Sequence, residues 1–190
     1  KVIKMSPPYR TELNARIKQT EVFPGGDIEK IVKTLNKMAK SPKNKDYLDQ
    51  IYYALGNLYL SRQDTTNAIK NYILAAQKST REGIEKAISQ LTLGNIYFNQ
   101  RKYTKAQPCY AEAIPLIDET YPDYAQLVKR SEVLDELAIH AQNVELQDSL
   151  QQLAALPEPE RTKIIQQKID DLIAAEKRAE EEAKKEAYLA

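Results

Sequence analysis

The side chains that most often carry out catalysis or hold metal ions are scarce in this sequence. His140 is the single histidine and Cys109 is the single cysteine, and the two fall in different predicted helices. A lone cysteine forms neither an internal disulfide nor a two-cysteine metal site. We interpret Cys109 as a small core hydrophobe and His140 as a surface or capping residue. The pattern therefore assigns no catalytic, cofactor-binding or metal-binding residue, and we expect no cofactor.

The acidic pairs and the glycines give no stronger chemical signal. Asp170-Asp171 and Glu180-Glu181-Glu182 lie in helical sequence, where adjacent carboxylates point in different directions and favour a solvated face. Gly25-Gly26 lacks the lysine and the spacing of a phosphate-binding loop. The sequence predicts that the chain is not an enzyme.

Composition narrows the class of partner. The 28 basic and 27 acidic residues give a net charge of +1, which favours neither a nucleic acid nor an acidic membrane surface. No stretch approaches the roughly 20 apolar residues of a membrane-spanning helix. Five glycines, no tryptophan and 12 tyrosines indicate an all-helical chain packed with large rings. Because the sequence begins at Lys1, we expect it to be a piece of a longer protein.

A repeat in the middle of the chain is the strongest pattern. The segment YYALGNLYLSRQDTTNAIKNYILAAQKS, from Tyr52, aligns without gaps on QLTLGNIYFNQRKYTKAQPCYAEAIPLI, from Gln90. The matched pairs, all at the same separation, are Leu55 with Leu93, Gly56 with Gly94, Tyr59 with Tyr97, Ala68 with Ala106, Tyr72 with Tyr110 and Ala75 with Ala113. Their spacing predicts two helices per repeat, with close approach at the glycine and alanine and with tyrosines beside them. We expect Asp64 or Thr65 to cap the second helix, and Thr104 to do so in the later copy.

These positions resemble the tetratricopeptide-repeat (TPR) family from about Asp49 to Asp118. The resemblance implies an all-α, TPR-type α-solenoid of stacked helix pairs with a long C-terminal helix. The clear repeats are 49–82 and 87–120. The family period is about 34 residues, and we attribute the longer period here to the loop around 80–83. The terminal proline of the family pattern is replaced by Thr80 and Asp118.

The flanking segments predict further helix pairs and a C-terminal cap. Residues 9–40 form one degenerate pair, with helices at 9–20 and 27–40 and a turn and cap at 25–27. Residues 122–156 form another, with helices at 122–141 and 144–156. Together they make a TPR-like array over 1–156. Residues 157–190 form a capping and charged C-terminal helix. Its apolar stripe should pack on the last repeat and comprises Ile164, Ile165, Ile169, Leu172 and Ile173.

In TPR proteins the first helices of successive repeats line a concave groove that binds a protein or peptide. The resemblance carries that role to Gln50, Tyr53, Asn57, Leu60 and Ser61, to Ile88, Leu91, Asn95, Phe98 and Asn99, and to Lys129 and Arg130. Asn57 and Asn95 either grip a peptide backbone or merely suit the bend near glycine. Tyr53 and Leu91 replace the lysines of a carboxylate clamp, so an apolar segment or a helix fits the groove better.

A narrower resemblance covers residues 43–187. The stretches KNKDYLDQIYYALGNLYL and LAALPEPERTKIIQQKIDDLIAAEKRAEEEAKKEA are similar to the TPR lipoproteins of bacterial gliding-motility and type IX secretion machinery. This implies a non-catalytic periplasmic scaffold, anchored to the outer membrane through a lipidated cysteine upstream of this chain. Two alternatives remain open: a cytosolic (cytoplasmic) TPR adaptor or co-chaperone, and an accessory repeat domain of a larger enzyme or regulator.

Overall fold

The computed structural model describes residues 11, 14, 15, 17, 18, 28–80 and 83–189. All regular elements of this part are helical, which confirms the predicted all-α class. The α-helices are α2 (Ile28–Ala39), α3 (Leu48–Ser61), α4 (Thr65–Lys78), α5 (Ile84–Asn99), α6 (Tyr103–Ala113), α7 (Tyr124–Ala155) and α8 (Glu158–Leu189). Two 3₁₀ turns, Pro42–Tyr47 and Ile114–Leu116, connect them. The chain divides into two compact units, Lys1–Ala141 and Gln142–Ala190.

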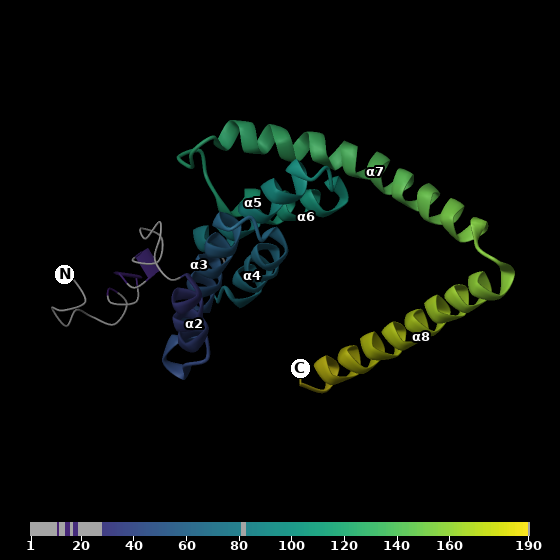
Figure 1. Ribbon diagram of the computed structural model, residues 1–190, viewed down its shortest axis with the longest axis horizontal. Coiled ribbons are helices and arrows are strands. Elements are labelled where there is room, and N and C mark those ends of the chain that lie inside the picture. Colours follow the sequence, from purple (N-terminus) through teal and green to yellow (C-terminus); the bar gives the residue numbers. More distant parts are fainter. Residues whose placement is uncertain (1–10, 12–13, 16, 19–27, 81–82, 190) are drawn as a thin grey trace. The chain divides into compact units, whose positions relative to one another are not determined.

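In the first unit the helices stack in the order of the sequence. The helix α3 packs against α4, α4 against α5, and α5 against α6 (Figure 1). The two helix pairs α3–α4 and α5–α6 are the two repeats read from the sequence. Their first helices end alike, because the equivalent residues Gln63 and Arg101 both have left-handed backbone, with φ of 62° and 58°. The following amides of Asp64 and Lys102 then bond back to the carbonyls of Tyr59 and Tyr97 at 3.0 and 2.9 Å.

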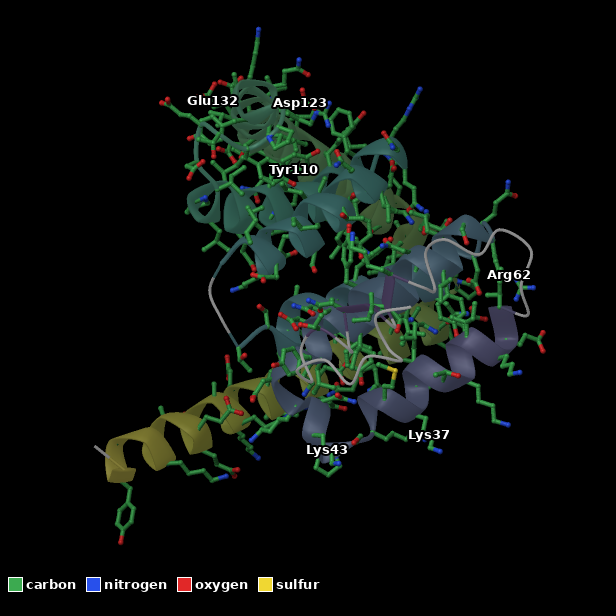
Figure 2. The ribbon with its side chains drawn as sticks, turned by 90° about the vertical axis from the view of Figure 1, so that its left-hand side faces the viewer. Lys37, Lys43, Arg62, Tyr110, Asp123 and Glu132 are labelled. Atoms are coloured by element: carbon green, nitrogen blue, oxygen red, sulfur yellow. The ribbon has the colours of Figure 1, made fainter. Side chains whose placement is uncertain are left out.

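Each repeat glycine lies under a tyrosine ring of the partner helix. A Cβ on Gly56 would lie 2.6 Å from Cε1 of Tyr72, and a Cβ on Gly94 would lie 2.9 Å from the ring of Tyr110. Both rings are fully buried, and Figure 2 shows Tyr110 among the helices of the second repeat. Since contacts between carbon atoms need about 3.5 Å or more, only glycine permits this approach. The predicted pairing of a small residue with a tyrosine is confirmed in both repeats.

The turn chemistry follows the prediction in one repeat and departs from it in the other. The Asp64 carboxylate accepts the Asn67 N–H at 3.0 Å and caps α4, as predicted. Thr104 was predicted to cap the later copy, but α6 begins at Tyr103 and its N-cap residue is Lys102, which makes no side-chain cap bond. The reason is the repeat alignment, which pairs Lys102 with Asp64 and places Thr104 inside the first turn.

The upstream pair is described in part. Its second helix is confirmed as α2, with Leu35 buried against Ile51 and Leu55 of the first repeat. The predicted first helix at 9–20 lies largely outside the described residues, although Ile17 is buried in the same cluster. The predicted turn and cap at 25–27, and Arg81 and Glu82 of the loop at 80–83, also lie outside them.

The predicted downstream pair is wrong. Residues 124–155 form one unbroken helix, α7, in place of the two predicted helices with a turn near 142–143. The segment contains neither glycine nor proline, so nothing interrupts the i→i−4 hydrogen bonds. In the first unit, Leu127 and Leu134 of α7 join the core formed with Tyr110.

The C-terminal helix α8 extends to Leu189, as the predicted charged helix requires. Within the second unit, the five side chains of its apolar stripe are exposed by between 41% and 64%. The packing of this stripe on the last repeat stays a prediction. The Lys184 ammonium lies 4.0 Å from the Glu180 carboxylate, an example of the expected i,i+4 pairing. The proposed division of the chain at 156/157 stays a prediction.

Candidate protein-binding groove

Each repeat holds the same hydrogen-bonded pair on the side of its first helix. In the first repeat the Tyr72 hydroxyl donates to Asn57 Oδ1 at 2.7 Å. In the second, the Tyr110 hydroxyl donates to Asn95 Oδ1 at 2.6 Å. The asparagine follows the glycine on the first helix, so the ring that covers the glycine reaches it directly. The sequence leaves two roles open for these asparagines, and the structure adds a third: each accepts a hydrogen bond from the hydroxyl of the repeat tyrosine.

Arg130 of α7 completes the pair in the second repeat. Its Nη1 donates to Asn95 Oδ1 at 2.9 Å and to the Tyr110 oxygen at 3.0 Å. Its guanidinium carbon also lies 4.9 Å from the centroid of the Phe98 ring, within cation–π distance. Three predicted groove residues, Asn95, Phe98 and Arg130, are therefore brought together, but they bind one another and leave little of this part of the groove for a partner.

Leu91 and Tyr53 occupy equivalent positions and have different surroundings. Leu91 is 4% exposed and belongs to the core around Tyr110, so it does not line a surface that a partner can reach. Tyr53 is half-buried. Its ring centroid lies 5.5 Å from that of Tyr72, and its hydroxyl lies 3.4 Å from Thr92 Oγ1. This links the first repeat to α5 and leaves one side of the ring open.

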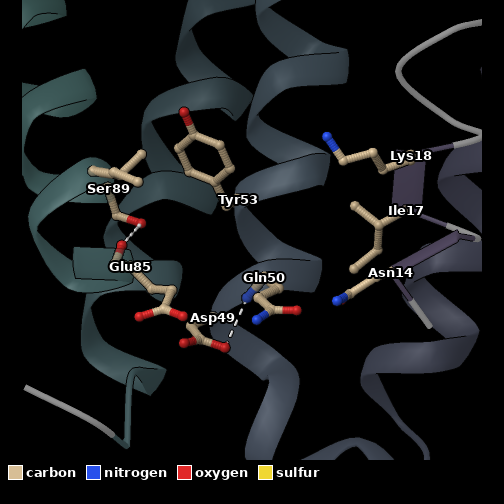
Figure 3. Close-up of a pocket in the computed structure, with 9 residues that line it drawn as sticks. Asn14, Ile17, Lys18, Asp49, Gln50, Tyr53, Glu85 and Ser89 are labelled. Atoms are coloured by element: carbon tan, nitrogen blue, oxygen red, sulfur yellow. Dashed lines mark hydrogen bonds between the residues drawn. The ribbon is translucent and has the colours of Figure 1, made fainter. Parts of the chain in front are cut away.

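A cavity of about 280 Å³ lies beside Tyr53 (Figure 3). It is walled by the first helices of the two repeats and by the described residues of the N-terminal segment. The lining residues are Asn14, Ile17, Lys18, Asp49, Gln50, Tyr53, Glu85, Ile88 and Ser89. Gln50, Tyr53 and Ile88 were predicted to line the groove. The upstream residues were missed, as were Asp49, Glu85 and Ser89, although the helical spacing of 85, 88 and 89 could have found two of them.

The polar groups of this cavity are held in place by the backbone. The Asp49 carboxylate accepts the N–H of Gln50 at 2.8 Å, and the Ser89 hydroxyl donates to the Glu85 carbonyl at 3.1 Å. The side chains of Asp49 and Ser89 are almost fully buried. The Glu85 carboxylate lies at the cavity wall (Figure 3). The cavity thus combines an apolar surface with fixed polar groups, as binding sites commonly do.

The remaining predicted residues lie at the ends of the two first helices or on α7. Leu60 is 37% exposed, and Asn99 at the equivalent end of α5 is also exposed. The exposed Ser61 donates its hydroxyl to the Leu58 carbonyl at 2.8 Å. Lys129 is exposed and lines a second, wider cavity of about 760 Å³. That cavity is lined by Glu119, Tyr121, Asp123, Tyr124, Ala125, Gln126, Val128, Lys129 and Glu132.

The two cavities are enriched in acidic groups. Asp123 and Glu132 lie together at the edge of the second repeat, whereas Tyr110 lies among its helices (Figure 2). Lys129 and Arg130, which were predicted to supply positive charge to the groove, diverge as neighbours on a helix do. Arg130 turns to Asn95, and only Lys129 faces the wider cavity.

Burial favours the neutral forms of two tyrosine hydroxyls and one thiol near these sites. Burial raises the pKa of the Tyr72 hydroxyl, and the nearby Tyr53 adds to the effect. Burial also raises the pKa of Tyr121 in the wider cavity. Burial, with the nearby Glu112 carboxylate, raises the pKa of the Cys109 thiol to about 12. Cys109 is thus a buried thiol whose S–H donates to the Lys105 carbonyl at 3.3 Å, as its interpretation as a core residue requires.

No cluster of three or more His, Cys, Asp or Glu side chains suited to a metal ion occurs among the described residues. His140 is exposed, as predicted. Within the part of the chain that the structure describes, no helix is both long and apolar enough to cross a membrane.

Comparison with known proteins agrees with the repeat geometry. Residues 49–77 and 87–116 match the family described as Tetratricopeptide repeat. No curated protein sequence matches the chain significantly. The first matched segment coincides closely with α3–α4, and the second covers most of α5 together with α6 and its 3₁₀ extension. Residues 49–77 and 87–116 are therefore tetratricopeptide repeats, set within an all-α solenoid.

Proposed function

We propose that this chain is a non-catalytic scaffold that binds a segment of another protein on the inner face formed by α3 and α5. Tetratricopeptide repeats imply protein partners. The observation that carries the location is the cavity of about 280 Å³ between the two first helices, with Tyr53 in its wall. Leu60 continues the same face of α3, because residues 53, 57 and 60 follow at helical spacing.

The first repeat is the better candidate for the contact. In the second repeat, Arg130 already covers the inner face by binding Asn95 and Phe98. In the first repeat, Leu60 is exposed and the cavity lies beside Tyr53. A partner segment would therefore lie along α3 and the start of α5. Binding there buries apolar surface and uses the polar groups of the cavity for orientation.

Site-specific photo-crosslinking tests the location. A p-benzoylphenylalanine side chain at position 60 of α3 places the crosslinker on the proposed face, and position 70, exposed on α4, is the matched control. We expect irradiation of cell-envelope extract to yield a discrete adduct from position 60 and none from position 70. An adduct from position 70 alone would move the binding site to the outer face of the second helices.

We also propose that the chain works in the bacterial cell envelope, as part of a periplasmic, outer-membrane-anchored lipoprotein that supports a secretion or gliding-motility complex. The support is the resemblance over residues 43–187, which joins the repeats to the Leu-Pro stop and charged helix that follow them. Labelling cells with a fatty-acid analogue tests this proposal. The full-length gene product should carry the label and sediment with outer membranes, and an unlabelled protein in the cytosolic fraction would favour the adaptor alternative.

A further inference from the structure

The second unit leaves aliphatic side chains uncovered on both of its helices. It consists of residues 142–155 of α7 and the whole of α8, joined by Leu156 and Pro157. None of the side chains that the structure describes in residues 142–189 is buried. Its large aliphatic side chains that are exposed by between 41% and 64% are Val144, Leu146, Leu150, Ile164, Ile165, Ile169, Leu172 and Ile173.

Helices in this state lack the interaction that usually stabilises helices in proteins. An isolated helix of about 12–15 residues is marginal in water, and packing of its apolar face against other elements supplies most of its stability. A surface that covers these stripes is therefore expected. The spacing of the apolar residues indicates which surface fits them.

The stripes of the two helices match each other in antiparallel register. On α7, Leu146 and Leu150 are four residues apart, and on α8, Ile165 and Ile169 are four residues apart. An antiparallel pairing that sets Leu150 opposite Ile165 therefore sets Leu146 opposite Ile169. Both stripes continue at a step of three residues, to Leu153 on α7 and to Leu172 on α8. Alternating steps of three and four residues are the core positions of a coiled coil.

The residues beside these two central layers bring no like charges together. They are Gln147 and Ser149 on α7, and Gln166 and Lys168 on α8. In coiled coils the flanking positions decide which helices pair, and like charges there oppose pairing. The flanks thus permit the antiparallel arrangement.

The exposed aliphatic area suits an interface between two copies of the chain. Covering a Leu or Ile side chain completely removes about 100 Å² of apolar surface from water. Because the side chains of the stripes are about half-exposed, two copies together offer on the order of 800 Å². With the polar side chains that flank them, this approaches the roughly 1,200–2,000 Å² of a stable interface. A closed hairpin within one copy would leave Val144 and Ile164 uncovered, since they lie on other sides of their helices.

The connection between the helices favours pairing between copies over closure within one copy. It has only two residues, and the ring of Pro157 disfavours helical backbone at Leu156. A second copy can supply the facing helix while this connection keeps its conformation. Short connections of this kind favour the exchange of an element between two copies.

We propose that residues 142–189 are a self-association arm, in which α8 of each copy lies antiparallel on residues 142–155 of the other. The resulting dimer presents two copies of the repeat unit, so a partner with two binding segments is held more tightly than by one copy. This surface is separate from the inner face of α3 and α5. The proposal and the packing of the α8 stripe on the last repeat of its own chain exclude each other.

Disulfide trapping with the whole 190-residue chain tests the pairing. Cys109→Ala removes the native thiol, and each chain then carries one introduced thiol, from Leu150→Cys or from Ile165→Cys. We expect a mixture of the two chains to give a covalent heterodimer under mild oxidation, and neither chain alone to do so. Chains with Gln152→Cys and Gln167→Cys, on the outward sides of the same helices, are the matched controls and should not cross-link when mixed.

Sedimentation equilibrium measures the strength of the dimer. Ile169→Glu should weaken it by at least about 100-fold, because the symmetric pairing would bury an unpaired carboxylate twice. Gln167→Glu adds the same charge on the outward side of α8 and should leave the dissociation constant within about twofold. Thermal unfolding of the repeat unit should be unchanged in both variants, which shows that each chain is folded.

The inference is overturned if the chain is monomeric at every concentration tested, since the stripe would then be covered within its own chain. It is also overturned if the Ile165→Cys chain cross-links to itself and the mixture gives no heterodimer, because α8 would then pair with α8. A chain that carries both cysteines and closes internally at every dilution would identify the hairpin instead.

Discussion

Replacing Gly56 by alanine should destabilise the first repeat through one contact. The new Cβ would lie 2.6 Å from Tyr72 Cε1, and 2.7 and 2.9 Å from two further ring atoms. The ring is fully buried and its hydroxyl is bonded to Asn57, so it has no free space to enter. Overpacking of this kind costs about 1–3 kcal/mol, and loss of the hydroxyl bond adds about 1 kcal/mol. Alanine returns about 1 kcal/mol through its helix propensity. We therefore expect a net loss of about 2 kcal/mol.

Urea unfolding followed by circular dichroism measures this loss, and the chain supplies two comparisons. Gly94→Ala should cost less, because its Cβ would meet the Tyr110 ring at 2.9 Å. Gly83→Ala should be close to neutral, because the nearest atom is 3.7 Å away on the flexible Glu85 side chain. In a Tyr72→Leu background, Gly56→Ala should turn stabilising as the ring is removed. A wild-type or higher urea midpoint for Gly56→Ala alone would refute the close approach of α3 and α4.

Three further predictions each concern a single side chain. Tyr110→Phe should cost more stability than Tyr72→Phe in urea unfolding, about 2 against about 1 kcal/mol, because the Tyr110 hydroxyl also accepts from a charged arginine; equal losses would contradict that geometry. Lys102→Asp should raise the stability of the chain by about 1 kcal/mol by supplying the missing N-cap of α6, and an unchanged melting temperature would count against it. Cys109, with a pKa of about 12, should react with a thiol reagent at pH 8 only as fast as the chain unfolds, and rapid labelling would show that it is accessible. Because this pKa is raised in the folded state, the contribution of Cys109 to stability should be intact below the unfolded value near 8.5 and decline as the pH rises toward 12.

The sequence carried enough information to predict the repeats, because their positions are fixed by local spacing. Six matched pairs at one constant separation located the helix pairs that the structure contains. The close approach at Gly56 and the cap at Asp64 followed from residue type alone. Each of these features joins residues of one helix pair, so the sequence pattern within that pair decides it.

The groove was predicted less well, because its contacts join different repeats. The helical spacing predicts that Asn95 and Phe98 share one face of α5. It does not predict which residues of other helices contact that face. Arg130 follows Asn95 by nearly a whole repeat and binds it across the repeat boundary. The prediction that Leu91 lines the groove missed its burial for the same reason, since that burial depends on neighbours beyond α5. Because Lys129 and Arg130 are both basic, residue type alone predicts the same role for both. Their positions on α7 decide which of them faces the second repeat.

The unbroken α7 connects these departures. The helix α7 follows the second repeat, and its side chains that face this repeat differ in burial from those on its other sides. On the inner side, Leu127 and Leu134 enter the core and Arg130 closes the second repeat. On the other sides of the helix, Val133 and Ile139 are 54% and 60% exposed. The inner faces of the two repeats therefore differ: α7 supplies the Arg130 guanidinium to Asn95, whereas the equivalent position one repeat earlier holds Thr92, whose hydroxyl donates to the Ile88 carbonyl.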